Sequence, residues 1–587
     1  MNDPHPAQLS VNTQSDKCFE LAKSWLNECT KKHYSCRPYE GYPLPTRLLD
    51  VSAPDASSGL RLVVSENLNH TDAYVVLSYC WGKGQPFVLN KANLEECQDH
   101  VDLQLLPKTI HDAVNVTRRL GHRYLWVDSL CIIQDSPEDW NNEAAKMGEI
   151  YANGLLTIAA TYAPASTIGC FTERNPLSYL PCRIYGSRSN GVYICQSKDA
   201  RRLDLLFQSF VDEAPLNRRA WVVQERLLSR RILHFTSQGL FWECSDLLAF
   251  DSNPTGMRVR SGLRHNLRGL LKPGQRGWRY KQPSRLNRLV QSKVDEMQAT
   301  GNGGSSWSTG SDFTKSWLEI VSLFTNCGLT KSDDRIPALL GIVTEIQHVT
   351  HLEFCAGCWY TSTSPGFSPH HLMWMIDQPC ELPLSQRAPS WSWFSVDGPV
   401  VFPDSGRLSM KEAIDQLQGK TTGHFWQIRS QIINMESPTG ENVSRSLVPR
   451  CCQMSPVAKA ITLPINELKT IGFKPDAKHQ EPYPSSLTIV RLLESTSKYA
   501  RLLTLGLSET EMAHRQRTLR GIAGLVLLKQ DGNDDVYHRI GAFEVRPPYA
   551  PEEHQLSYYD RDRDAKLVTL DLPRRFDEVE ARIMHVE

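Results

Sequence analysis

The sequence has no long run of uncharged apolar residues and no excess of either charge. No apolar run approaches the roughly 18–20 residues that a membrane-spanning helix needs, so we expect no membrane span. Lys and Arg together number 65, and so do Asp and Glu. This balance gives no bulk electrostatic attraction toward nucleic acid or an anionic membrane, although a local patch stays open, and we expect no nucleic acid partner.

A secretory signal and a disulfide scaffold are also missing. Residues 1–17, MNDPHPAQLSVNTQSDK, are polar and lack the apolar core of a secretory signal. The 16 cysteines are spread over 587 residues without the dense spacing of a disulfide-rich domain, which favours reduced thiols. We therefore expect a cytoplasmic protein.

Several common site motifs do not occur. The sequence has no P-loop, no GxGxxG fingerprint and no GxSxG nucleophile elbow. Cys29, His33 and Cys36 do offer three metal-capable side chains in the spacing C-x3-H-x2-C. A structural zinc site needs four ligands, however, and no obvious fourth follows. We therefore expect these three residues to bind no metal.

Residues 71–161 alternate strand and helix patterns. Short apolar runs at 73–80, 123–128 and 154–161 read as buried strands, and the segments 106–121 and 137–153 between them read as helices. Near-continuous apolar strands separated by helices predict a parallel sheet that is covered on both faces, and hence an α/β fold. We expect the three strands to be adjacent and parallel, joined by right-handed helical crossovers.

The sequence predicts four regions. They are an N-terminal helical segment (1–70), the α/β domain (71–245), a linker-containing region (246–312) with a Gly/Ser-rich stretch at 296–312, and a mixed α/β region (313–587). Near the end of the α/β domain, RILHFT and GLFWEC are expected to pair as a hairpin. In the last region, 388–400 and 520–545 read as β-structure, the second as a hairpin around Asp531-Gly532.

Three long motifs identify a family. AYVVLSYCWG (73–82), the run from LPKTIHD to LLTIAAT (106–161) and the run from RRAWVVQER to LFWEC (218–244) resemble, in order, the three blocks of the fungal heterokaryon incompatibility (HET) domain. The resemblance spans roughly 74–245. It implies a filamentous-fungal protein of non-self recognition that triggers incompatibility-type cell death through contacts with a protein partner or a second copy of itself.

The resemblance also carries an expectation about the fold and two alternative functions. HET domains have been proposed as distant relatives of Toll/interleukin-1 receptor (TIR) domains, which are flavodoxin-like parallel sheets, and some TIR domains cleave NAD. A TIR-like fold is therefore implied. One alternative is an NAD glycohydrolase-like enzyme with NAD as its substrate, and the other is an accessory protein of a fungal biosynthetic gene cluster. A TIR enzyme places its glutamate four residues after a tryptophan, whereas Trp140 and Glu143 are three residues apart.

Glu143 is the candidate catalytic carboxylate. It shares one helical stripe with Trp140, Met147 and Ile150. A carboxylate in an apolar stripe loses hydration, so its pKa is raised unless a cation lies beside it. In one interpretation it stabilises an oxocarbenium-like transition state while the nicotinamide–ribose bond breaks. In the other it is half of a core ion pair, with an arginine from 217–226 as partner.

Polar residues after the first two strands are further candidates. Asp128 and Ser129 end the second strand, where side chains face the ligand cleft of a parallel sheet, although both could instead cap the next turn. Tyr79, Trp81 and Gly82 follow the first strand, where glycine lets the backbone approach a ligand phosphate. The alternative for these three is a turn with core packing.

Glu225 lies four residues after Trp221, so the two share a helical face. We interpret this segment as a packing helix that closes the sheet. It would supply Arg218, Arg219 or Arg226 as the partner of a buried acid.

Overall fold

The computed structural model describes residues 12–37, 43–51, 60–68, 72–84, 87–174, 182–185, 192–194, 203–258, 312–350, 352–360, 369–376, 380, 383 and 387–402, and the strands given below from residue 425 onward. Within these segments, no helix combines the length and the apolar character that crossing a bilayer requires. The Gly/Ser-rich stretch at 296–311 and Asp531-Gly532 lie outside the described residues.

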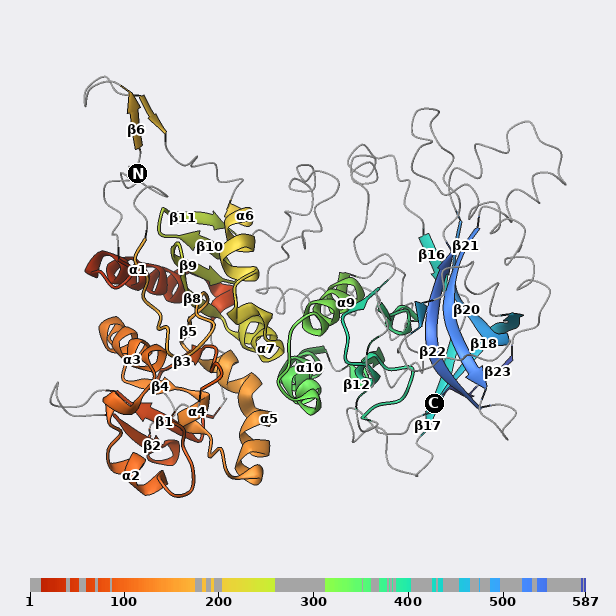
Figure 1. The fold of residues 1–587 in the computed structure, drawn as a ribbon, viewed down its shortest axis with the longest axis horizontal. Coiled ribbons are helices and arrows are strands. Elements are labelled where there is room, and N and C mark those ends of the chain that lie inside the picture. The colour runs from red at the N-terminus through yellow and green to blue at the C-terminus, as the bar shows by residue number, and fades with distance from the viewer. Residues whose placement is uncertain are drawn as a thin grey trace.

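A nine-stranded sheet organises the N-terminal part of the chain (Figure 1). The strand order is β11-β10-β9-β8-β5-β3-β4-β1-β2. The strands are β1 (Arg47–Asp50), β2 (Arg61–Val64), β3 (Tyr74–Ser78), β4 (Tyr124–Trp126), β5 (Leu156–Ala159), β8 (Arg231–Thr236), β9 (Gly239–Cys244), β10 (Leu247–Phe250) and β11 (Asn253–Arg258). A separate short hairpin joins β6 (Cys182–Tyr185) to β7 (Val192–Ile194).

The centre of this sheet is parallel. β3 pairs in parallel with β4 on one side and with β5 on the other, and β5 pairs in parallel with β8. These strands are buried along their whole length, as near-continuous apolar runs predict. The predicted adjacency of the three runs is thus confirmed, and so is the hairpin of β8 with β9.

Helices cover both faces of the sheet (Figure 1). On one face α1 (Asp16–Lys32) packs against α3 (Lys108–Leu120), and on the other α5 (Pro137–Asn153) packs against α7 (Ala220–Leu228). The shorter helices are α2 (Leu94–Asp99), α4 (Asp128–Cys131) and α6 (Leu203–Phe207). Gly121 ends α3 in the left-handed conformation, at a φ of 88°, which glycine adopts without a Cβ penalty. The fold is α/β with a mixed sheet.

The sheet extends beyond the region that the sequence pattern marks. The segment before residue 71 contributes α1, as expected, but also β1 and β2, and β1 pairs antiparallel with β4. β10 and β11 extend the other edge past residue 245. Strands of four residues such as RLLD are too short for their periodicity to separate strand from helix.

Two longer helices follow the undescribed segment 259–311. They are α9 (Asp312–Thr325) and α10 (Pro337–Thr350), and α10 packs on α5 and α7. Short pairs of strands come next, β12 (Glu353–Cys355) with β13 (Cys358–Tyr360) and β14 (Met375–Ile376) with β15 (Val400–Val401). The expectation of β-structure over 388–400 is wrong for most of that stretch, because residues Trp393–Ser395 form a 3-10 turn.

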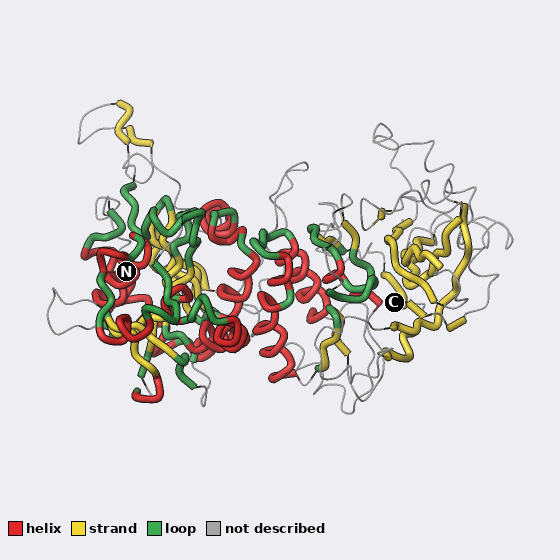
Figure 2. Tube along the Cα trace, turned by 60° about the horizontal axis from the view of Figure 1, so that its bottom comes forward, coloured by secondary structure: helices red, strands yellow, loops and turns green. Residues whose placement is uncertain are grey.

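A second nine-stranded sheet lies in the C-terminal part, where Figure 2 shows strands gathered apart from the helices. Its strands are β16 (Phe425–Ile428), β17 (Gln431–Glu436), β18 (Gln453–Pro464), β19 (Lys474–Pro475), β20 (Ser486–Thr496), β21 (Arg520–Lys529), β22 (Val536–Val545), β23 (Arg582–Ile583) and β24 (His585–Val586). β21 and β22 pair antiparallel, as predicted for 520–545.

Candidate functional site

The carboxyl ends of β3 and β4 bring several of the predicted residues together. The chain passes from β3 to β4 on one side and then to β5 on the other side of β3. In open parallel sheets, ligands bind at the carboxyl edge where the connections diverge in this way. Tyr79 and Trp81 follow β3 at this edge, and Asp128 and Ser129 follow β4.

Hydrogen bonds join the two strand ends directly. The indole Nε1 of Trp81 donates to Asp128 Oδ2 at 2.8 Å, and the Tyr79 hydroxyl donates to Ser129 Oγ at 2.8 Å. Asp128 Oδ1 also accepts from the backbone N–H of Ser129 at 2.7 Å, so Asp128 orders the first turn of α4 as well. Burial raises the pKa of Asp128, while the bond from Trp81 and the charge of Arg219 lower it.

Glu225 completes this group, and the sequence did not predict it as a site residue. It projects from α7, is 5% exposed and accepts a hydrogen bond from the Ser78 hydroxyl. Burial raises its pKa to about 7, against the opposing effects of Arg219 and Ser78. Arg219 donates to the backbone carbonyl of Tyr79 and acts electrostatically on both Glu225 and Asp128. The expectation that this helix region supplies an arginine to buried acids is confirmed.

We call these seven residues the strand-end cluster: Ser78, Tyr79, Trp81, Asp128, Ser129, Arg219 and Glu225. Its inner members are buried, whereas Trp81, Asp128 and Arg219 are partly exposed. Two carboxylates therefore share one arginine, with one acid at the rim and one behind it. A carboxyl group with a pKa of about 7 can both give and take a proton near neutral pH, which is the property of a general acid–base.

Glu143 lies outside the strand-end cluster. Its side chain is 2% exposed, and its Oε1 accepts from Thr46 Oγ1 at 2.7 Å and from Lys146 Nζ at 3.1 Å. Thr46 immediately precedes β1, so the pair lies on the β1 side of the same edge. Among the described residues, the cation that pairs with Glu143 is Lys146, one turn further along α5. The expected partner, an arginine from 217–226, does not form this ion pair.

Gly82 serves a turn that packs on a neighbouring loop. Its φ is 84°, and a Cβ at this position would lie 2.6 Å from the Cβ of Ala165. Ser166 Oγ donates to the carbonyl of Trp81 at 2.9 Å, which holds the two segments together. The need for glycine here follows from this close approach and from the positive φ.

Two cavities lie away from the strand-end cluster. One, of about 570 Å³, is lined by residues that include Arg61, Asp72, Arg123 and Tyr124. Tyr124 is the first residue of β4, so this cavity opens at the amino end of the parallel strands. The second, of about 200 Å³, lies along α3 beside His111 and Asn115. Neither is at the edge where parallel sheets bind ligands.

The raised pKa of Glu225 predicts a pH dependence of stability. The folded state binds this proton more tightly than the unfolded chain, so the stability that it contributes is complete below pH 4.5 and is lost as pH rises through about 7. The difference in unfolding free energy between wild type and Glu225→Gln should therefore fall between pH 5 and pH 8, by up to about 1.4 kcal/mol per pH unit. Urea unfolding at both pH values measures it.

Glu149→Gln, a substitution of an exposed glutamate on α5, is the control for the change of side chain itself. Parallel stability profiles for wild type and Glu225→Gln over this range would contradict the prediction.

The comparisons with known proteins give one match. Residues 74–225 match the model of a family described as heterokaryon incompatibility protein (HET). The match begins at the first residue of β3 and ends at Glu225, so every residue of the strand-end cluster lies inside it. No curated protein matches the chain, and no solved structure does.

Proposed function

From the heterokaryon incompatibility (HET) domain that the chain carries over residues 74–225, we propose that it acts in fungal non-self recognition. In this role it triggers incompatibility-type regulated cell death through contacts with a protein partner or with a second copy of itself. The family match carries the proposal. The TIR-like nature of the domain is supported by the order β4-β3-β5-β8, which numbers 2-1-3-4 along the chain, as in flavodoxin-like sheets.

Overexpression in a filamentous fungus tests this function. The wild-type chain should kill the cells that express it, scored by uptake of a dye that living cells exclude. Glu225→Gln should abolish killing at equal protein level, because it removes the charge that pairs with Arg219 inside the strand-end cluster. Glu149→Gln should kill like wild type. Healthy cells that accumulate folded wild-type protein would contradict the proposal.

A second candidate, an NAD glycohydrolase-like activity, is favoured by the chemistry of the strand-end cluster. Glu225 takes the role that the sequence gave to Glu143, because it lies at the strand ends beside Asp128 and Ser78. Its negative charge would stabilise the cationic ribose that forms while nicotinamide leaves. Asp128 and Trp81, which are partly exposed, stand where a substrate would first make contact.

Nicotinamide release from NAD by the purified protein distinguishes the two glutamates. Glu225→Gln should lower kcat by at least about 100-fold, as loss of a group that stabilises transition-state charge does. Glu143→Gln should leave kcat near the wild-type value and reduce stability modestly instead, because the half-exposed Lys146 loses its ion pair and keeps only its hydrogen bond to Thr46. Wild-type protein that leaves NAD intact would remove this candidate and leave the recognition function standing.

A further inference from the structure

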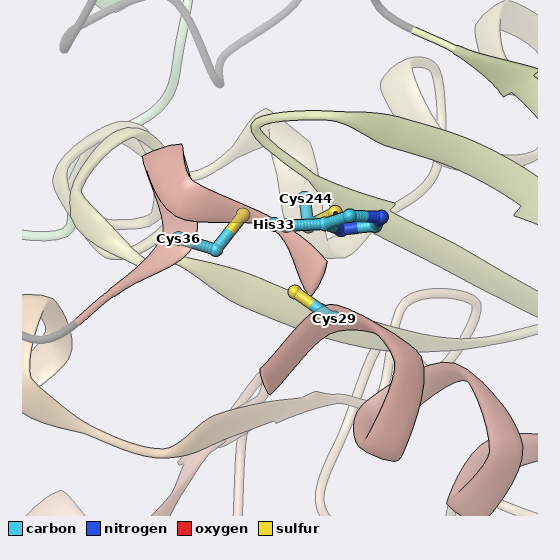
Figure 3. A group of neighbouring side chains, drawn as sticks. All are labelled: Cys29, His33, Cys36 and Cys244. Atoms are coloured by element: carbon cyan, nitrogen blue, oxygen red, sulfur yellow. Dashed lines mark hydrogen bonds between the residues drawn. The ribbon is translucent and has the colours of Figure 1, made fainter. Parts of the chain in front are cut away.

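Four side chains with metal-binding atoms converge in the interior, three from residues 29–36 and the fourth from residue 244 (Figure 3). Cys29 lies in the last turns of α1, His33 ends that helix, and Cys36 lies in the 3-10 turn that follows (Tyr34–Cys36). Cys244 is the last residue of β9. The three sulfur atoms and an imidazole nitrogen all lie within 4.8 Å of one another.

This spacing fits tetrahedral zinc. Zn–S bonds of about 2.3 Å and Zn–N bonds of about 2.0 Å place the ligand atoms of a tetrahedron roughly 3.5–3.8 Å apart. Cys244 Sγ and His33 Nδ1 are 3.4 Å apart. The remaining distances between ligand atoms are at most 4.8 Å, so side-chain movements of about 1 Å would bring them into this range. All four residues are buried, with exposed fractions of 0–3%. The group is therefore closed to solvent, as structural zinc sites are.

A buried arginine beside the thiols supports a bound metal independently. Arg231 is 3% exposed, and its Nε donates to Cys29 Sγ at 3.1 Å. Its other donors bond to the carbonyls of Cys36, at 2.6 Å, and Leu155, at 3.1 Å. No acid pairs with it in the part of the chain that the structure describes. A buried cation without a counter-charge is costly, and three thiolates, one imidazole and Zn²⁺ together carry one negative charge.

We propose that Cys29, His33, Cys36 and Cys244 bind one Zn²⁺ as a structural site, with Arg231 as the counter-charge of the complex. All four positions are filled by protein, so the metal has no open position for chemistry. It joins the end of α1 to the end of β9, both outside the segment 74–225 that matches the family. The expectation of no metal rested on a missing fourth ligand. That premise is wrong, because Cys244 comes 211 residues after His33.

Metal content of the untagged full chain, purified under reducing conditions, tests the site. Elemental analysis should find one zinc per chain after dialysis, and Cys244→Ser and Cys36→Ser should each reduce it to a trace. Cys97→Ser is the matched control, because Cys97 is also buried but lies outside the group. Zinc that survives Cys244→Ser, or wild-type chain without zinc after refolding in its presence, would overturn the proposal.

Two further measurements keep the test decisive where a serine variant does not fold. His33→Cys preserves four ligands and should retain zinc, whereas His33→Ala should lose it. Cobalt in place of zinc should give the visible absorption of a tetrahedral thiolate complex and a thiolate-to-metal band that fits three sulfurs in wild type and four in His33→Cys. A disulfide among these cysteines in freshly isolated protein, or an octahedral cobalt spectrum, would equally count against the site.

Discussion

Replacing Cys244 by serine is expected to lower the melting temperature of the protein by about 10–20 °C. Structural zinc contributes apparent binding free energies of about 10–16 kcal/mol in zinc-finger peptides, and that energy becomes folding energy. The domain here has a large core of its own, so we expect about 5 kcal/mol of it to appear as lost stability. At about 2–4 °C per kcal/mol for a domain of this size, the stated range follows.

The loss should begin at the N-terminal segment. α1 keeps contacts that do not need metal, since Trp25 Nε1 donates to the carbonyl of Pro254 at 2.9 Å and its ring lies 6.1 Å from that of Trp242. The turn after α1 carries Cys36 and follows directly on His33, so its position depends most directly on the metal. Without the metal, the buried Arg231 also loses the negative counter-charge that the zinc–thiolate complex provides. Protease cleavage near residues 33–37 should therefore precede global unfolding.

Calorimetry and limited proteolysis of wild type, Cys244→Ser and Cys97→Ser measure this effect. Cys97→Ser loses only packing and should lower the melting temperature by a few degrees. Treatment of wild type with a strong chelator under reducing conditions should reproduce the Cys244→Ser result. A melting temperature that stays within about 2 °C of wild type in both experiments would show that the metal-binding group does not stabilise the fold.

The parallel centre of the sheet was predictable because each of its signals is local. Runs such as YVVLS are buried on both faces, so their apolar character appears in the sequence without reference to any partner. Gly121 and Pro137 mark helix ends through their own backbone preferences. These features fix β3, β4 and β5 and the two helices between them.

The choice of glutamate was not predictable in this way. Glu143 and Glu225 each share a helical face with a tryptophan, three and four residues earlier in the sequence. Local spacing therefore cannot tell which of the two glutamates lies at the strand ends. The packing of α7 against α5 decides it, with Trp140 and Trp221 edge to face at 6.3 Å between them. Glu143 then meets Lys146, and Glu225 meets Ser78.

Local patterns also missed the fourth metal-capable residue and the turn around Trp391 and Trp393. Cys244 joins Cys29 and Cys36 only after the sheet has placed β9 beside α1, and no local spacing encodes that. Trp391 and Trp393 alternate with serine as in a half-buried strand, yet both are fully buried around a 3-10 turn. Ser392 between them is also buried, at 1% exposed, and donates to the carbonyl of Ala356, so polar and apolar residues here do not alternate between solvent and core.

Replacing Gly148 by leucine is expected to destabilise the protein by about 3 kcal/mol or more, against the sign of helix propensity. Leucine is more favourable than glycine in a helix interior, by somewhat less than the roughly 0.8–1 kcal/mol that separates alanine from glycine. At Gly148, however, a Cβ would lie 2.6 Å from the Cα of Gly341 on α10 and 3.2 Å from Leu228 Cδ1 on α7. The nearest atom is backbone, so relief requires α10 to move away from α5, and overpacking of this kind costs about 1–3 kcal/mol or more.

That movement would also break a buried hydrogen bond. Gln224 Oε1 accepts from the backbone N–H of Gly341 at 2.7 Å, and Gln224 is fully buried. Urea unfolding of Gly148→Leu should show the loss, and hydrogen exchange should show faster exchange along α10 than along α3. Ala145→Leu, at an exposed position of the same helix, supplies the control and should match wild type or fall slightly below it. A Gly148→Leu protein as stable as its control would mean that α10 does not rest on α5, and the helices after residue 312 would then fold apart from the sheet.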